Sequence, residues 1–329
     1  MVKILVTGAA GFIGAHVART LVDAGHDVIG VDCVNDYYDA DLKRARLSWI
    51  GERDRFVFHE IDIADHDALP AAPGVMDCAT IIHLAAQAGV RHSIENPFAY
   101  ARSNLVGHLS ILELARRSPK RPRLVYASSS SVYGANTKTP FAESDRVDAP
   151  VSLYAATKRS DEMLSESYAR LYGIEQIGLR FFTVYGPWGR PDMAYWLFAD
   201  RILAGEPIKV FNNGDLSRDF TYIDDVAAAV VATALDPFKP EGDAPHRIYN
   251  VGNGRPVSLL RFIELIETAL GREAVREFTD MQPGDVRSTC ADIAAITQDF
   301  GYAPRTPLEV GIPKFAAWFT DYRQASGSS

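Results

Sequence analysis

The chain has 329 residues, of which 47% are hydrophobic, and it carries a net charge of -8 with an isoelectric point near 5.5. This is enough apolar material for a large core, and the length favours about two domains. The acidic balance argues against a general nucleic-acid or anionic-membrane surface, so a few arginines would have to bind any anionic ligand. We therefore expect a small-molecule partner, no nucleic acid and no membrane.

The cysteines and the N-terminal residues indicate the compartment. Cys33, Cys78 and Cys290 form no CxxC pair, which predicts neither a zinc site nor a disulfide framework and is typical of a reducing environment. The apolar start "MVKILVTG" is too short for a signal peptide, and no apolar run approaches the roughly 18 residues of a membrane span. These features predict a cytoplasmic protein without a metal site.

In the first half of the chain, short β-branched runs alternate with longer amphipathic ones. Alternation of this kind predicts a doubly wound parallel sheet with helices on both faces, an α/β fold. The expected strands are "KILVTG", "DVIGVD", "FVFHEID", "TIIHLA", "RLVYASS" and "EQIGLRFF".

After Tyr185 the pattern becomes richer in Pro, Gly and aromatic residues, which predicts a smaller α/β C-terminal domain. The stretches "RDFTYIDDVAAAVVATAL" and "RIYNVG" resemble the first half again, so the two domains are expected to interleave. The predicted boundaries are 1–184 with returning segments at about 218–252 for the first domain, 185–217 and 253–323 for the second, and 324–329 for a disordered tail.

The stretch "VTGAAGFIG" is the first motif that indicates a ligand. It places Gly8, Gly11 and Gly14, with Phe12 and Ile13 between the last two, directly after a strand and at the start of a helix. This spacing permits a tight turn, a close approach of the backbone to a pyrophosphate, and a helix N-terminus that faces the phosphates. It predicts a Rossmann-type dinucleotide-binding domain.

The ends of the next strands refine the cofactor. Asp32 ends the second strand, where a carboxylate can accept hydrogen bonds from ribose hydroxyls and repels a 2′-phosphate; this favours NAD over NADP. Asp62 and Ile63 end the third strand, where an adenine ring is expected. Leu84, Ala85, Ala86 and Gln87 end the fourth, where small side chains would allow close approach, although tight packing explains them equally well.

A tyrosine and a lysine in a helical pattern are the candidate catalytic pair. Tyr154 and Lys158 stand at i and i+4 and therefore on one face. Together with the glycine turn and the preceding Ser129, they resemble the extended short-chain dehydrogenase/reductase superfamily over essentially the whole chain. A phenol, with a pKa of about 10, is a poor base unless a nearby cation stabilises the phenolate. The resemblance implies that Tyr154 is the base, that Lys158 supports it, and that Ser129 hydrogen-bonds the reacting oxygen.

Within this superfamily the chain is most similar to nucleotide-sugar epimerases, and among them to UDP-glucuronate 4-epimerases. The similar stretches are "NDYYDADLKRARL", "AGVRHSIENP", "RFFTVYGPWGRPDMA", "RDFTYIDD" and "PGDVRSTCAD". The resemblance implies further NAD contacts at Asn35, Lys43, Asn104, Ala127, Ser128 and Phe181. It implies UDP-sugar contacts at Arg91, Met193, Val210 and Phe211, with Arg190, Arg218 and Arg287 near the diphosphate, a role that suits arginine.

Four serines in "LVYASSSSVYG" separate the relatives by chemistry. Dehydratases of the superfamily typically carry Asp-Glu where this chain has Ser130 and Ser131, and UDP-glucuronate decarboxylases typically carry Glu at 131. The two serines could bind a sugar carboxylate without added negative charge. Neutral-sugar epimerases usually have Asn where this chain has Thr183, whose hydroxyl suits a C6 carboxylate. The resemblance therefore implies interconversion of UDP-glucuronate and UDP-galacturonate without decarboxylation.

Three alternatives stay open at this stage: a UDP-glucose/UDP-galactose 4-epimerase, a UDP-glucuronate decarboxylase, and a non-catalytic NAD-binding protein. The family commonly forms homodimers through helices near 98–117 and 151–172, and we expect the same here.

Overall fold

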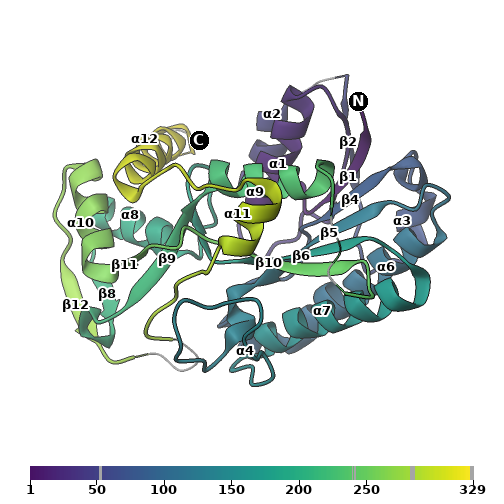
Figure 1. The fold of residues 1–329 in the computed structure, drawn as a ribbon. Helices are drawn as coiled ribbons and strands as arrows, with labels where there is room; N and C mark the ends of the chain where they lie inside the picture. Colours follow the sequence, from purple (N-terminus) through teal and green to yellow (C-terminus); the bar gives the residue numbers. More distant parts are fainter. Residues whose placement is uncertain (52–53, 239, 241, 282–285, 327–329) are drawn as a thin grey trace.

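The larger lobe of the protein is built on seven parallel strands. The computed structural model describes residues 1–51, 54–238, 240, 242–281 and 286–326. The strand order, visible in Figure 1, is β10 (His246–Val251), β6 (Gln176–Phe181), β5 (Arg123–Ser129), β4 (Thr80–His83), β1 (Lys3–Thr7), β2 (Asp27–Asp32) and β3 (Phe56–Glu60). The predicted doubly wound sheet is confirmed, with its order reversing between β1 and β4.

Helices cover both faces of this sheet. One face carries α1 (Phe12–Asp23), α2 (Ala40–Ile50) and α9 (Ile223–Leu235), and the other carries α3 (Ala68–Ala71), η1 (Val75–Asp77), α6 (Gly107–Arg117) and α7 (Leu153–Tyr172) (Figure 1). Each helical layer buries its own apolar cluster, with Val17 and Val230 on the first face and Ile111 and Leu112 on the second. The sheet is therefore a rigid platform, with the carboxyl ends of its strands at one edge.

The smaller lobe holds two short sheets. The first has the strand order β11 (Pro256–Ser258), β9 (Ser217–Tyr222) and β7 (Thr183–Tyr185). The second pairs β12 (Arg276–Thr279) with β8 (Ile208–Phe211), and β8 is followed by η4 (Asn212–Gly214). The helices that follow these strands in sequence or pack on them are α8 (Ala194–Ala204), α10 (Leu259–Leu270) and α12 (Leu308–Ser326), while α11 (Ala294–Phe300) contacts β10 of the large sheet. This α/β lobe stands beside the strand ends of the large sheet (Figure 1).

Two details differ from the sequence expectation. The return to the first lobe was expected at about 218, but β9 pairs with β7 and β11, so the chain returns with α9 and β10. The tail was expected from 324, whereas α12 continues to Ser326; residues 327–329 lie outside the described residues.

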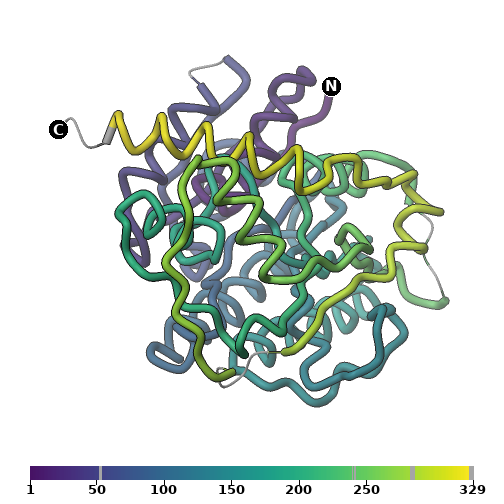
Figure 2. The backbone as a smooth tube through the Cα atoms, turned by 90° about the vertical axis from the view of Figure 1, so that its left-hand side faces the viewer, coloured from purple at the N-terminus to yellow at the C-terminus, as the bar shows by residue number. Residues whose placement is uncertain are grey.

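The N-terminus and α12 lie at the same end of the molecule, as Figures 1 and 2 show, with α12 running across that end. Among the described residues, no helix combines the length and the hydropathy that crossing a membrane requires.

Candidate active site

The glycine turn joins β1 to α1 in very little space. A Cβ on Gly14 would lie 1.9 Å from the Gly8 carbonyl oxygen, and one on Gly8 would lie 2.7 Å from the Ala85 nitrogen. Gly8 also has φ +72°, which a residue with a side chain adopts at a cost. The first amides of α1, starting at Phe12, have no acceptor within the helix, so the turn is a cradle that fits a pyrophosphate.

The end of β2 places three predicted cofactor residues together. Asp32 accepts hydrogen bonds from the amides of Ala10 (3.1 Å) and Val34 (2.9 Å), which fixes its carboxylate beside the glycine turn. Burial raises the pKa of Asp32, and the Val34 and Ala10 amides and the Lys43 charge oppose this. Lys43 donates to the backbone and side-chain oxygens of Asn35 (2.6 and 2.5 Å). The three residues therefore lie together where the ribose contact is predicted.

Asp62 and Ile63 were expected to end the third strand, but β3 ends at Glu60 and both residues lie in the loop just after it. Asp62 forms an ion pair with Arg102, with 2.9 Å between Oδ2 and Nη2. Ile63 packs against Gly107, where an added Cβ would lie 2.6 Å from the Ile63 Cδ1 atom. Both residues therefore line the strand edge at which the adenine contact is predicted.

The segment after β4, Leu84 to Gln87, is held by Asn104. The Asn104 side chain accepts from the Gln87 amide (2.8 Å) and donates to the Gln87 carbonyl (3.1 Å) and to Thr157 on α7 (2.9 Å). Asn104 lies in a π-helical turn, η2 (Ala101–Val106), a distortion that frequently marks functional sites. Its side chain thus positions the Leu84–Gln87 segment from both sides.

Helix α7 carries the candidate catalytic pair. The Ser152 hydroxyl caps its start by accepting from the Ala155 amide (3.1 Å), and Gly173 ends it with φ +66°. Tyr154 is half-exposed in the first turn, whereas Lys158 is buried and donates to the Ala127 carbonyl at the end of β5 (3.1 Å). The lysine therefore reaches the strand end where the serines begin.

The four serines point to different surroundings. Ser128 is buried and its hydroxyl donates to Glu162 of α7 (2.6 Å). Because the hydroxyl is engaged there, the predicted contact of Ser128 with NAD would be made by its backbone. The Ser129 oxygen accepts from the Ser131 amide (3.2 Å) and its hydroxyl donates to the Ser131 hydroxyl (3.1 Å). Ser130 and Ser131 begin η3 (Ser130–Tyr133) and are half-buried.

Glu162 anchors this loop through a buried ion pair. Arg180 donates from Nε and Nη2 to the two Glu162 oxygens (2.8 and 2.9 Å) and from Nη1 to the Tyr133 hydroxyl (3.1 Å). Burial opposes ionisation, but Arg180 holds the pKa of Glu162 below its usual value. Ser129 pairs with Phe181 across β5 and β6, and Thr183 follows two residues later as the first residue of β7 in the three-stranded sheet of the smaller lobe.

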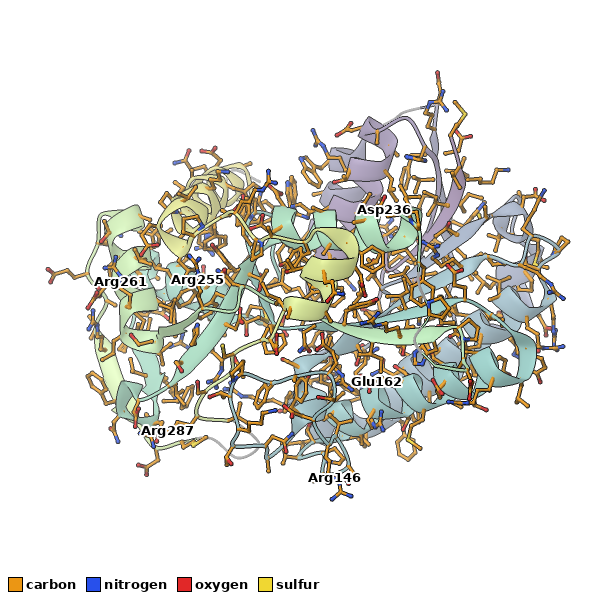
Figure 3. The ribbon with its side chains drawn as sticks, in the orientation of Figure 1. Arg146, Glu162, Asp236, Arg255, Arg261 and Arg287 are labelled. Atoms are coloured by element: carbon orange, nitrogen blue, oxygen red, sulfur yellow. The ribbon has the colours of Figure 1, made fainter. Side chains whose placement is uncertain are left out.

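The three predicted diphosphate arginines fall into two groups. Arg218 donates to the Ser217 and Arg287 carbonyls (2.8 and 3.2 Å), and Arg287 pairs with Asp215 (2.5 Å), so these two lie together. Figure 3 shows Arg287 in the smaller lobe and Glu162 on α7 in the larger one. Arg190 lies apart from them and pairs with Asp192 (2.5 Å).

The remaining predicted substrate residues come from both lobes. The Arg91 guanidinium stands 5.3 Å from the centre of the Phe211 ring, which joins the segment after β4 to the end of β8. Val210 is buried in β8, and Met193 precedes α8. Within the stretch 283–292, residues 283–285 lie outside the described residues.

The sequence interpretation missed two site residues. Arg46 is fully buried and donates to the carbonyls of Ala10 (3.1 Å), Trp188 (2.9 Å) and Gly189 (2.6 Å), which ties the glycine turn to the segment before Arg190. Asp161 is also buried and pairs with Lys158. The sequence shows that Arg46 stands three residues after Lys43 and Asp161 three residues after Lys158. It does not show that both side chains are buried, which is what makes them site residues.

Comparison with known proteins places the chain in a family. The profile of the NAD dependent epimerase/dehydratase family matches residues 4–252. UDP-glucuronate 4-epimerase 1 of Arabidopsis thaliana is 46% identical over 98% of this chain and 77% of its own length, and a probable UDP-glucuronate 4-epimerase of Rhizobium meliloti is 45% identical over 98% of both.

Solved structures agree. A UDP-glucuronic acid 4-epimerase from Bacillus cereus, in complex with UDP-glucuronic acid and NAD, has a TM-score of 0.89 at 33% identity, covering 97% of this chain and 99% of its own. A UDP-glucose 4-epimerase from Thermotoga maritima has a TM-score of 0.86 at 29% identity with the same coverage. The chain therefore belongs to the NAD dependent epimerase/dehydratase family, and NAD, which fits the glycine turn and Asp32, is its cofactor.

Proposed function

We propose that this UDP-sugar epimerase interconverts UDP-glucuronate and UDP-galacturonate by transient oxidation at C4. The observation that carries the proposal is the Tyr154/Lys158 pair on α7, whose lysine bonds the end of β5, together with the four serines that end β5 and begin η3, with no carboxylate among them. The named 4-epimerase relatives support the reaction class.

The roles of the protein groups follow from their places. Tyr154 takes the proton of the C4 hydroxyl, because the Lys158 ammonium on the same helix face stabilises its phenolate. NAD, when bound, accepts the C4 hydride and later returns it. Ser129 hydrogen-bonds the reacting oxygen. The 4-keto sugar turns over about its link to a diphosphate held by Arg218 and Arg287, so that the returning hydride would meet the opposite face of C4. Tyr154 then gives the proton back to the C4 oxygen.

Retention of the sugar carboxylate is the second requirement. Oxidation at C4 of a glucuronate gives a β-keto acid, which loses CO₂ readily unless its carboxylate is restrained. Ser130 and Ser131, which follow β5, and Thr183, two residues after the end of β6, offer hydroxyl donors without a competing negative charge. We assign the carboxylate to these three hydroxyls.

The direct test is chromatography of UDP-glucuronate incubated with the pure protein and NAD. We expect UDP-galacturonate, with no net formation of NADH. UDP-xylose or a 4-keto-pentose in the absence of UDP-galacturonate would contradict the proposal, and a lack of any transient NADH absorbance with UDP-sugars would favour a non-catalytic protein.

The UDP-glucose/UDP-galactose alternative is separated by Thr183→Asn assayed on both substrate types. If Thr183 holds the carboxylate, this variant loses activity on UDP-glucuronate by about tenfold or more relative to UDP-glucose, the scale of one lost hydrogen bond to a charged group. Equal effects on both substrates would remove Thr183 from the carboxylate site.

The functional unit is proposed to be a homodimer formed through α6, α7 and the segment before them. This face exposes large apolar side chains to solvent, namely Phe98, Val106, Leu109, Leu153, Met163 and Leu171. A contiguous exposed apolar surface commonly marks a protein interface.

A further inference from the structure

The candidate lysine has a buried carboxylate as its closest charged neighbour. Lys158 Nζ lies 3.0 Å from Asp161 Oδ2, one helical turn further along α7, and the two side chains are 3% and 1% exposed. The lysine donates a second hydrogen bond to the Ala127 carbonyl. These two acceptors hold two of the three ammonium hydrogens and leave the third for the site.

The other titratable groups around Lys158 and Asp161 are neutral or paired, so these two residues carry the main charges there. The imidazoles of His83 on β4 and His108 on α6 are buried, and burial with the Lys158 charge lowers the pKa of His83 to about 3, so both rings are neutral. Glu162 is balanced by Arg180. The Tyr126 phenol on β5, which also faces Asp161, is buried and neutral because burial raises its pKa.

The other Asp161 oxygen is unused. In the described part of the chain, Oδ1 is buried and has no hydrogen-bond partner. Burial raises the pKa of Asp161 to about 6, against the attraction of Lys158. An ion pair with a purely structural role would normally have partners for both carboxylate oxygens. Here the fold keeps a buried, half-satisfied carboxylate next to the Lys158 ammonium.

We propose that Asp161 is a positioning residue that fixes the Lys158 ammonium and partly cancels its charge as felt at Tyr154. The inference rests on the proposed roles of Tyr154 and Lys158. A full ammonium charge would stabilise the phenolate further, and the Asp161 carboxylate limits that effect. Below about pH 6, protonation of Asp161 removes the limit.

The test is an ultraviolet titration of tyrosinate in the NAD-bound protein, with Tyr154→Phe subtracted as the blank. Asp161→Asn keeps the size and the acceptor for Lys158 but removes the charge, so we expect the Tyr154 midpoint to fall by about one pH unit. The acidic limb of the kcat/KM profile should move in the same direction. Asp161→Ala also removes the acceptor and should lower kcat about tenfold further.

The matched control is Glu264→Gln, which breaks an exposed i,i+3 pair with Arg261 on α10 and should move neither the midpoint nor the pH profile. An unchanged midpoint in Asp161→Asn would overturn the inference, as would equal losses of kcat in both Asp161 variants without a shift. The titration does not depend on which UDP-sugar is converted, so a failure of the proposed substrate appears separately, in the product assay.

Discussion

At the scale of single residues, Arg46 shows how one buried cation can join two parts of a site. Its guanidinium is fully buried on α2 and satisfies the carbonyls of Ala10, Trp188 and Gly189, from the glycine turn and from the segment that leads to Arg190. Because no backbone amide in the described part of the chain bonds these carbonyls, Arg46 substitutes for secondary structure at the junction.

Arg46→Met should therefore destabilise the protein. Removing the donors leaves buried carbonyls unsatisfied, which costs about 3 kcal/mol in the free energy of unfolding, measured by urea denaturation. Arg44→Met is the control, because Arg44 lies on the same helix, is exposed, and pairs loosely with Glu60 at 3.6 Å. Similar losses in the two variants would refute a special role for Arg46.

At the scale of elements, the turn between β1 and α1 determines how closely the backbone can approach a phosphate. Three glycines achieve this, and Gly14 has the least space: its missing side chain lets α1 start against the Gly8 carbonyl. The strand, turn and helix thus act together as one binding element.

Gly14→Ala should raise the Kd of NAD about tenfold or more, measured by calorimetry, because the new Cβ pushes α1 away from the turn. The control is Gly173→Ala at the end of α7, where φ is +66° but no atom lies within 4 Å of the added Cβ. That change should cost about 1 kcal/mol of stability and leave the Kd unchanged. Equal Kd values for the two variants would contradict this account of the turn.

At the scale of the whole molecule, the exposed apolar face on α6, α7 and the segment before α6, which includes Phe98, predicts the oligomeric state. Phe98 is 84% exposed, so Phe98→Asp should convert a dimer into a monomer in light scattering by placing a charge in the interface. Phe278→Asp is the control, since Phe278 is 51% exposed on β12 in the other lobe. A wild-type monomer, or a Phe98→Asp dimer, would refute the interface.

The large sheet, the glycine turn and the Tyr154/Lys158 pair could be predicted from the sequence because each is local. Alternating apolar runs report strands and helices, and a fixed spacing of three glycines or of two side chains on a helix face has one geometric meaning. The register of the small sheets could not be predicted in this way: β9 reads as a continuation of the first lobe, yet its partners β7 and β11 come from distant parts of the chain.

The sequence by itself therefore determined the fold class, the cofactor and the candidates for the chemistry, since these depend on local periodicity and motif spacing. Tertiary structure alone decided which groups the candidates contact. It turned the Ser128 hydroxyl toward Glu162, joined Arg218 to Arg287, and placed Asp161 behind Lys158 in a setting where both are buried. Burial and long-range packing set these directions, and no spacing along the chain encodes them.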